Sequence, residues 1–279
     1  MLSNSVVTAL RRSLAAVLAC SAALIGGTDV SAQQKSTLEI VKSRGTLIAG
    51  VRSDSRPFGF IDSKGELVGF EIEVVKYIAN KLGVKIELRP VTSATRIPML
   101  QSGQIDLAAA AMNITRQREE TIDFSIPHVV VSGKLLVKKG SDIKDVVDLK
   151  GKSIAFLQGS PPTTVARIQA KAEGSTIVTL PDAPQAVQAV LQGKVAALIM
   201  DSAPLMMFAK DHPEKFEVVG EAWPPAPEGI GVRENDSRWR DAINFSIIDM
   251  WKDGTYHKVY REYFGVDPDP SFRVYLWEL

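Results

Sequence analysis

The chain has 279 residues, of which 45% are hydrophobic, and its 33 Lys and Arg residues almost balance its 32 Asp and Glu residues. This length exceeds the usual size of a single hydrophobic core, so it indicates one large domain or two smaller ones. A nearly neutral chain without a basic run argues against nucleic acid or an anionic membrane surface as a partner.

The N-terminal segment, residues 1–32, is predicted to be a secretory signal peptide. Arg11 and Arg12 precede the apolar stretch 13–26, and Val30-Ser31-Ala32 places small residues at the cleavage positions. The stretch is shorter than the roughly 20 apolar residues that a membrane span needs, and no other run approaches that length. We therefore expect a periplasmic protein whose remaining residues carry equal numbers of acidic and basic side chains.

The only cysteine of the chain, Cys20, lies inside this segment. Residues 17–20 have a weak likeness to a lipoprotein cleavage site, although Leu18 is unusual there, so lipidation of Cys20 is the alternative to cleavage after Ala32. Cleavage after Ala32 leaves no thiol, and therefore no disulfide, thiolate nucleophile or cysteine metal site.

From residue 46 onward, the chain alternates predicted strands and helices. Residues 46–51 and 58–61 predict strands, with a turn at 62–65. Residues 70–82 predict a helix, because apolar side chains recur at helical spacing, acids occupy the first turn and Gly83 follows. Residues 84–88 predict the next strand, and this β-α-β order implies a parallel sheet.

Two segments further along the chain resemble each other. In residues 100–112 and 191–200, a helix end is followed by a glycine, an apolar strand and a polar exit residue, which is Asn113 after the first segment and Asp201 after the second. Two similar α/β lobes would explain this repeat, although a helix-Gly-strand unit also arises by chance.

The end of the chain is expected to complete the lobe with which it starts. A strand-like stretch at 229–233 precedes a long amphipathic helix through Trp239 and Trp251. We predict a discontinuous first lobe of residues 33–130 and 224–279, and a second lobe of residues 131–223. The chain then crosses between the lobes twice, near residues 129–132 and 221–227.

Sequence motifs for metal, cofactor or nucleotide binding are absent. His128, His212 and His257 lack metal-ligand spacing, and no G-x-S-x-G, P-loop or G-x-G-x-x-G motif occurs. We therefore expect no metal site and no cofactor. An enzyme would have to use a lone carboxylate or histidine.

Charged residues follow several of the predicted strands. Arg52 follows the strand at 46–51, Arg96 follows the strand that ends near residue 91, Arg118 follows the exit at Asn113, and Asp201 ends the second repeat. Ligands of open α/β sheets bind at the carboxyl ends of the strands, so these charges would converge if the two lobes face each other.

Each of these residues also has an ordinary structural interpretation. Arg52 could extend to solvent, Arg96 could begin a helix without other contacts, and Arg118 could lie on a solvated helical face. Asp201 is a good helix N-cap. The strand-to-helix junction at 159–164 could hold an anion, but Pro161 and the proline after it remove two donors.

Several motifs occur in a fixed order along the chain: Gly69-Phe70-Glu71-Ile72-Glu73, Leu100-Gln101-Ser102-Gly103-Gln104-Ile105-Asp106, Asn113-Ile114-Thr115-Arg116-Gln117-Arg118, Asp123-Phe124-Ser125, Asp148-Leu149-Lys150-Gly151-Lys152 and Asp253-Gly254-Thr255. Together they resemble the periplasmic solute-binding proteins of the polar amino-acid type, which feed ABC importers. The resemblance covers nearly all of the chain after the signal peptide. It implies a two-lobe α/β fold, the type II periplasmic-binding-protein fold, in which each lobe is a mixed sheet flanked by helices and the ligand cleft lies between the lobes.

The resemblance also implies binding roles for individual residues. In such proteins an arginine at the place of Arg118 grips the α-carboxylate of an amino acid, and an aspartate at the place of Asp201 takes its α-ammonium group. Contacts at Ala111, Asn113 and Ser160 would complete the grip on the ligand's main-chain atoms.

The resemblance is greatest to the members that bind aspartate or glutamate. These have a basic residue at the place of Arg52 and a Ser-x-x-Arg-x-Pro stretch, which here contains Ser93 and Arg96. With Arg118 and Asp201, the site has two excess positive charges, and leaving one partner of a buried ion pair alone costs about 3–5 kcal/mol. We therefore expect a ligand with two carboxylates and one ammonium group. One positive charge remains, which Asp54 or Glu228 could offset.

The sequence departs from this family at two positions. Relatives usually have hydroxyl residues where Ala111 and Pro161 stand, so another polar amino acid, a small dicarboxylate or another organic acid is the alternative ligand. A few relatives are dehydratases, and in such an enzyme Glu228 would be the general acid. We expect instead a non-catalytic, monomeric receptor whose partner is the membrane permease of an ABC transporter.

Overall fold

A computed structural model describes residues 35–270 and 272, so the predicted signal peptide and Cys20 lie outside the described residues. The helices of the described residues are all too short or too polar to cross a membrane.

The first of two five-stranded sheets has the strand order β5-β1-β6-β13-β7. Its strands are β1 (Thr46–Val51), β5 (Lys85–Pro90), β6 (Leu107–Ala109), β7 (Asp123–Phe124) and β13 (Gly231–Val232). β1 pairs in parallel with β5 and β6, whereas β13 is antiparallel to β6 and β7. A small sheet beside it contains β2 (Asp54–Ser55), β3 (Gly59–Ile61) and β4 (Leu67–Val68).

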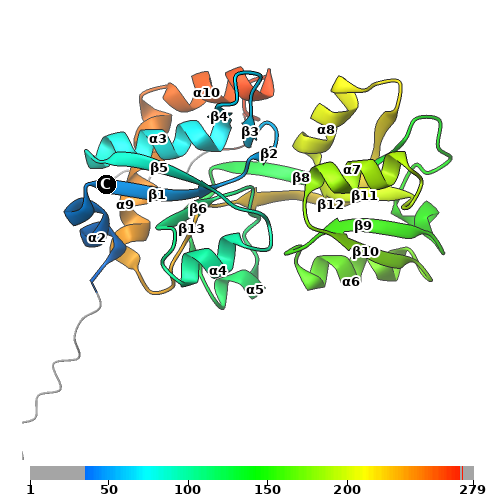
Figure 1. Cartoon of the computed structure of the whole chain (residues 1–279), viewed down its shortest axis with the longest axis horizontal. Helices are drawn as coiled ribbons and strands as arrows, with labels where there is room; N and C mark the ends of the chain where they lie inside the picture. The colour runs from blue at the N-terminus through cyan, green and yellow to red at the C-terminus, as the bar shows by residue number, and fades with distance from the viewer. Residues whose placement is uncertain (1–34, 271, 273–279) are drawn as a thin grey trace, which may run out of the picture. The chain divides into compact units, whose positions relative to one another are not determined.

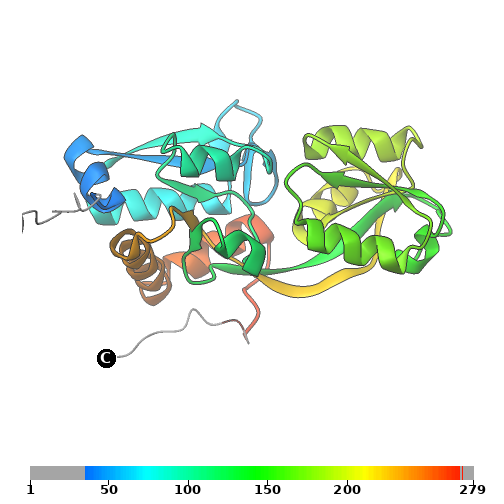
Figure 2. The same cartoon turned by 90° about the horizontal axis from the view of Figure 1, so that it is seen from below.

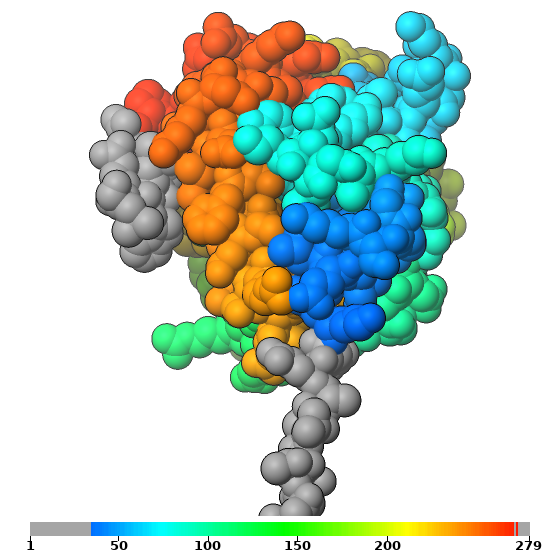
Figure 3. All heavy atoms as spheres, turned by 90° about the vertical axis from the view of Figure 1, so that its left-hand side faces the viewer, coloured from blue at the N-terminus to red at the C-terminus, as the bar shows by residue number. Residues whose placement is uncertain are grey.

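The helices that accompany this sheet are α2 (Thr37–Arg44), α3 (Phe70–Leu82), α4 (Arg96–Gln101), α5 (Arg116–Glu119), α9 (Ser237–Lys252) and α10 (Thr255–Phe264). We call these elements and the two sheets the first lobe. Figure 3 shows α2, α3, α9 and α10 packed together over one face of it.

The second five-stranded sheet has the order β10-β9-β11-β8-β12, and we call it and its helices the second lobe (Figure 1). Its elements are β8 (Val129–Lys138), η1 (Val146–Leu149), β9 (Ser153–Leu157), α6 (Pro162–Lys171), β10 (Thr176–Leu180), α7 (Ala183–Leu191), β11 (Ala197–Asp201), α8 (Ser202–Asp211) and β12 (Phe216–Glu228). β9, β10 and β11 are mutually parallel, and β8 is antiparallel to β11 and β12. The predicted α/β class with two mixed sheets is confirmed.

Both faces of the first sheet are buried, because side chains of β1 alternate between two apolar clusters. Leu47 and Val51 pack in a cluster with Phe70 and Trp239, whereas Ile48 packs on the opposite face with Leu100. Successive side chains of a strand point to opposite faces, so a strand with helices on both sides reads as a continuous apolar run. This is why residues 46–51 lack an alternating pattern.

The helix α3 has the predicted boundaries and the predicted end signals. Glu71 and Glu73 lie in its first turn, and Gly83 ends it with a φ of 70°, donating its backbone N–H to Ala79 O and Asn80 O. A left-handed residue after the last turn is the usual role of glycine at a helix end.

The strands β8 and β12 pair along their length and connect the two sheets (Figure 2). Val129 at the start of β8 lies opposite Glu228 at the end of β12, and Lys138 lies opposite Phe216. The register shifts around Trp223. The chain therefore passes between the sheets twice, through strands that are paired with each other.

The predicted repeat corresponds to equivalent places in the two lobes. β6 and β11 are each the third strand of a five-stranded sheet. The polar exit residue Asn113 follows β6, and the polar exit residue Asp201 is the last residue of β11. Three predicted strands have different bounds: the one at 58–61 begins at Gly59, the one at 84–88 runs from Lys85 to Pro90, and the one at 229–233 is reduced to Gly231–Val232. The latter is short because Ile230 N donates to the side chain of Ser125 instead of a strand carbonyl.

Candidate functional site

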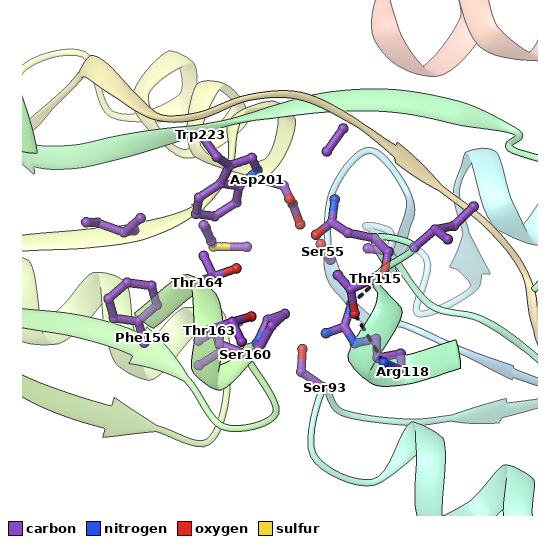
Figure 4. A pocket seen from close by; sticks show the side chains of 18 of the residues that line it. Ser55, Ser93, Thr115, Arg118, Phe156, Ser160, Thr163, Thr164, Asp201 and Trp223 are labelled. Carbon is purple, nitrogen blue, oxygen red and sulfur yellow. Dashed lines mark hydrogen bonds between the residues drawn. The ribbon is translucent and has the colours of Figure 1, made fainter. Parts of the chain in front are cut away.

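A cavity of about 320 Å³ lies where strand ends of the first lobe meet those of the second. Figure 4 shows Ser55, Thr115 and Arg118 on one side of it and Phe156, Thr163 and Thr164 on the other. All eight residues predicted for the site line this cavity: Arg52, Ser93, Arg96, Ala111, Asn113, Arg118, Ser160 and Asp201. The structure thus brings together positions that are up to 149 residues apart in the sequence.

Arg52 leaves the end of β1 and turns inward, with only 2% of its surface exposed. Its Nε and Nη2 donate to Asp54 Oδ1 and Oδ2 at 2.8 and 2.9 Å, and its Nη1 donates to Ser93 Oγ at 2.6 Å. The interpretation that Arg52 extends to solvent is therefore wrong. The guanidinium lines the cavity but already has a carboxylate partner.

Arg96 is the first residue of α4, and its buried side chain runs under the end of β6. Its Nη1 donates to the carbonyl oxygens of Ala110 and Ala111 at 2.5 and 2.8 Å, while its Nε has no partner within residues 35–270 and 272. Burial, followed by the positive charges of Arg118 and Arg52, lowers the pKa of Arg96 well below its usual value. The interpretation of Arg96 as a helix start without other contacts is wrong.

Arg118 lies in α5, whose N-cap Thr115 accepts a hydrogen bond from the Arg118 backbone N–H. The guanidinium donates from Nη1 to Asn113 O at 2.8 Å and from Nη2 to Gly159 O, in the second lobe, at 3.1 Å. Burial lowers the pKa of Arg118, against the opposing effect of Asp201 and Glu228. Arg118 is therefore buried, and the interpretation that placed it on a solvated helical face is wrong.

Asp201 ends β11 and occupies the N-cap position of α8, but its side chain caps no backbone amide there. Its Oδ1 is buried and has no hydrogen-bond partner in the part of the chain that the structure describes. Burial raises the pKa of Asp201 to about 6, although Arg96 and Arg118 oppose the increase. The expected capping role is thus absent, and the carboxylate is available to a cationic group in the cavity.

Gly159, in the loop before α6, lies against the Ser93 segment of the first lobe. Its φ is 81°, and a Cβ atom at this position would be 2.1 Å from Ser93 O. The next amide, Ser160 N, donates to Leu157 O inside the turn at 3.1 Å. The Ser160 amide is therefore already engaged, which weakens the prediction that this junction binds an anion through its backbone.

Glu228, at the end of β12, is a fully buried acid beside the cavity and not part of its lining. Neither carboxyl oxygen has a hydrogen-bond partner among the described residues. Burial, followed by the negative charges of Asp201 and Glu71, raises the pKa of Glu228 well above its usual value. Burial therefore favours the protonated form of Glu228.

Sequence reasoning missed a group of lining residues in the second lobe. These are Phe156, Thr163, Thr164, Arg167, Ile199, Met200 and Trp223. Thr163 and Thr164 belong to the junction noted from the sequence, and Arg167 lies one turn further along the same helix. Trp223 lines the cavity at a point where the register of β12 against β8 shifts, and no local sequence pattern indicates this shift.

Comparisons with known proteins agree with this arrangement. The model of a family described as bacterial extracellular solute-binding proteins, family 3, matches residues 47–266. An ABC transporter glutamine-binding protein of Bacillus subtilis is 35% identical over 255 residues, covering 90% of this chain and 92% of the relative. A glutamate/aspartate import solute-binding protein of Salmonella typhimurium is 29% identical over 259 residues, covering 89% of this chain and 86% of the relative.

Solved structures show the same fold. An ancestral arginine-binding protein bound to arginine has a TM-score of 0.75 and 40% identity, covering 80% of this chain and 99% of that protein. An ancestral amino acid-binding protein described as a precursor of cyclohexadienyl dehydratase has a TM-score of 0.74 and 33% identity, covering 82% of this chain and 100% of that protein. The two-lobe fold with helix-flanked mixed sheets is therefore the fold of this chain.

Proposed function

Because the chain belongs to family 3 of the bacterial extracellular solute-binding proteins and serves an amino-acid ABC importer, we propose that its ligand is an acidic amino acid, glutamate or aspartate. The importer's membrane permease is the proposed partner, and the proposed receptor acts as a monomer in the periplasm after loss of residues 1–32. The proposed lobes are residues 33–130 with 224–279 and residues 131–223, which the two sheets support.

One observation carries the choice of ligand: the charges of the cavity that have no ionic partner. Arg52 is neutralised by Asp54, whereas Arg96 and Arg118 contact only backbone carbonyl oxygens among the described residues. Asp201 is the lining acid whose Oδ1 lacks a partner among the described residues. Arg167 also lines the cavity, but its side chain is exposed, so we count only the buried cations Arg96 and Arg118. Two such cations and one anion are complementary to two carboxylates and one ammonium group, which is the charge set of an acidic amino acid.

The proposed roles follow from this complementarity. Arg118 and Asp201 hold the α-carboxylate and the α-ammonium group, with Ala111, Asn113 and Ser160 around the main-chain atoms. Arg96 holds the second carboxylate, supported by Ser93 and by Arg52, which donates to Ser93 Oγ. A simple dicarboxylate leaves Asp201 without an ammonium group. A basic amino acid leaves Arg96 without a carboxylate and adds a positive charge beside it, at a cost of several factors of ten in affinity.

A thermal-shift screen of the twenty amino acids and of small dicarboxylates tests the proposal. A ligand present at 100 times its Kd stabilises a protein by about 2.7 kcal/mol, so glutamate or aspartate should give the largest shifts. In Arg96→Ala the shifts caused by these acids should be much smaller, whereas Arg261→Ala, which breaks an exposed ion pair with Asp267, should respond like the natural chain. Shifts from neutral or basic amino acids alone would show that the ligand class is wrong.

A dehydratase role has a specific feature in its favour, the buried acid Glu228 with its raised pKa, and one similar structure is described as a precursor of such an enzyme. A general acid must lie within hydrogen-bond reach of its substrate, however, and Glu228 does not line the cavity. We therefore propose a non-catalytic receptor. Incubation with prephenate and measurement of an aromatic product decides between the two, because a binding protein forms none.

A further inference from the structure

The carboxylate of Glu71 links two segments beneath the cavity that are distant in the sequence. Glu71 lies in the first turn of α3 and is fully buried, as is His128. Its Oε2 accepts the backbone N–H of Ala111 at 2.9 Å, and its Oε1 is 2.9 Å from His128 Nε2. Neither Glu71 nor His128 lines the cavity, so neither is expected to touch a ligand.

Ala111 is held in a backbone conformation that a residue with a side chain rarely adopts. Its φ is 51°, in the left-handed region, which costs about 1–2 kcal/mol for a residue other than glycine. Such a conformation persists where surrounding contacts determine it. The hydrogen bond from Ala111 N to Glu71 is one of those contacts.

The same segment holds the guanidinium of Arg96. The carbonyl oxygens of Ala110 and Ala111 both accept from Arg96 Nη1, at 2.5 and 2.8 Å. A rotation of the Ala110–Ala111 backbone would therefore move both acceptors of this nitrogen together. The position of Arg96 thus depends on a conformation that Glu71 helps to determine.

His128 fixes Glu71 from the other side. It directly precedes β8, its ring stacks on Phe70 with 6.0 Å between the ring centres, and its carbonyl accepts from Tyr256 Oη at 2.8 Å. His128 Nε2 is the ring nitrogen that faces Glu71 Oε1, and His128 Nδ1 has no partner among the described residues, so we assign the ring proton to Nε2. His128 then donates to Glu71 and orients it toward Ala111.

From this chain of contacts, we propose that Glu71 and His128 are positioning residues that fix the Ala110–Ala111 backbone and thereby aim Arg96 at the ligand. The inference rests on the proposed function, in which Arg96 holds the second carboxylate of an acidic amino acid. Glu71 acts through Ala111, and His128 acts through Glu71.

The test is a double-mutant cycle with L-glutamate and L-glutamine as probes, measured by isothermal titration calorimetry. Glu71→Leu removes both acceptors at similar volume and should lower the affinity for L-glutamate about tenfold, and the affinity for L-glutamine much less. In an Arg96→Ala background, Glu71→Leu should cause no further loss, because residues that act through one another are not additive. Glu71→Gln keeps an oxygen for Ala111 N and should restore most of the affinity.

Asp106→Asn is the matched control, because Asp106 is also a buried acid that accepts a backbone amide of the first sheet, Ile48 N at 2.7 Å. It should lower the melting temperature without changing affinity. His128→Phe keeps the stacking on Phe70 and removes only the donor, so it provides the same test if Glu71→Leu does not fold. Its loss of L-glutamate affinity should likewise vanish in the Arg96→Ala background.

Two results overturn the inference in distinguishable ways. In the first, Arg96→Ala lowers L-glutamate affinity, but the effects of the Glu71 and Arg96 substitutions on the binding free energy simply add, or Asp106→Asn weakens binding as much as Glu71→Leu does. Glu71 then has only a general structural role, and the proposed function stands. If Arg96→Ala leaves L-glutamate affinity unchanged, the assigned role of Arg96 fails, and the inference fails with it.

Discussion

Arg52 and Asp54 form a two-pronged ion pair at the edge of the cavity, with both carboxylate oxygens within 2.9 Å of guanidinium nitrogens. Bidentate pairs of this kind fix the geometry of both partners. The pair therefore removes one of the three buried arginines of the cavity from the count of free charges, and the distinction between acidic and neutral ligands depends chiefly on Arg96.

Asp54→Asn should increase the preference for acidic ligands. The substitution removes the charge that neutralises Arg52 while keeping the size of the side chain, so a second cation becomes available to the distal carboxylate. We expect the ratio of L-glutamate to L-glutamine affinity to rise several-fold, measured by calorimetry at low salt. Asp211→Asn, which removes the exposed partner of Arg56, is the control and should leave the ratio unchanged. An unchanged ratio in Asp54→Asn would mean that Arg52 does not contribute to ligand charge selection.

Arg118→Ala should weaken all amino-acid ligands by similar factors, because the α-carboxylate is common to them. Truncating one partner of a buried, hydrogen-bonded charge pair costs about 2–5 kcal/mol. Arg96→Ala should instead weaken L-glutamate much more than L-glutamine. Equal losses for the two ligands in both variants would contradict the separate roles assigned to these arginines.

Gly159→Ala should weaken ligand binding by preventing the close approach of Gly159 to the Ser93 segment. The added Cβ would be 2.1 Å from Ser93 O, a backbone atom that cannot move like a flexible side chain. We expect at least about a tenfold loss of affinity. Gly83→Ala is the matched control: its φ of 70° imposes a similar backbone strain, but a Cβ there meets nothing within 4 Å. It should lower stability and leave the Kd unchanged, and an equal loss of affinity would refute the steric explanation.

Ligand affinity should increase with pH through about 6, where Asp201 ionises. An ammonium group binds the carboxylate form, so affinity should fall by up to about tenfold per unit below that pH. The ligand's own carboxyl groups titrate below about 4.5 and do not interfere above pH 5. Burial raises the pKa of Asp201, and Arg96, Arg118, Asn113 and Arg52 oppose the increase. Asp201→Asn should flatten the profile, whereas Glu228→Gln should retain it.

The unliganded protein should show the opposite dependence in its stability. The pKa of Asp201 is raised in the folded state from 3.8 to about 6, so folding takes up a proton between these values. The contribution of Asp201 to the free energy of unfolding is fully present below pH 3.8. It decreases by about 3 kcal/mol as the pH rises through about 6. Denaturant titrations of the natural chain and Asp201→Asn from pH 4 to 8 measure it. A difference that does not vary with pH would show that Asp201 titrates normally.

Much of the fold could be predicted from the sequence, because strands buried on both faces and amphipathic helices have local signatures. The apolar run 46–51 and the helix ending at Gly83 match β1 and α3. Boundaries were less predictable where a side chain replaced a strand partner, as Ser125 does for Ile230. The irregular register that brings Trp223 into the cavity has no local signal at all.

The sequence indicates that the charged residues of the site lie at strand ends, but it does not indicate which of them form ion pairs with each other. That Arg52, Arg96, Arg118 and Asp201 follow strands is a property of neighbouring residues, and strand ends of the same sheet converge for geometric reasons. Which arginine finds a carboxylate, and that Asp201 does not cap its helix, depends on side-chain directions.

By itself, the sequence determined the order of strands and helices, the glycine stops and the positions of the charged residues, since these follow from periodicity and covalent neighbours. Only the tertiary structure decided that Glu71 holds Ala111, 40 residues away, and His128, 57 residues away. It also decided that Arg52 is already paired and that Glu228 is buried without a hydrogen-bond partner among the residues that the structure describes. Contacts between distant residues depend on how the lobes pack, and burial sets the pKa values of the acids that result.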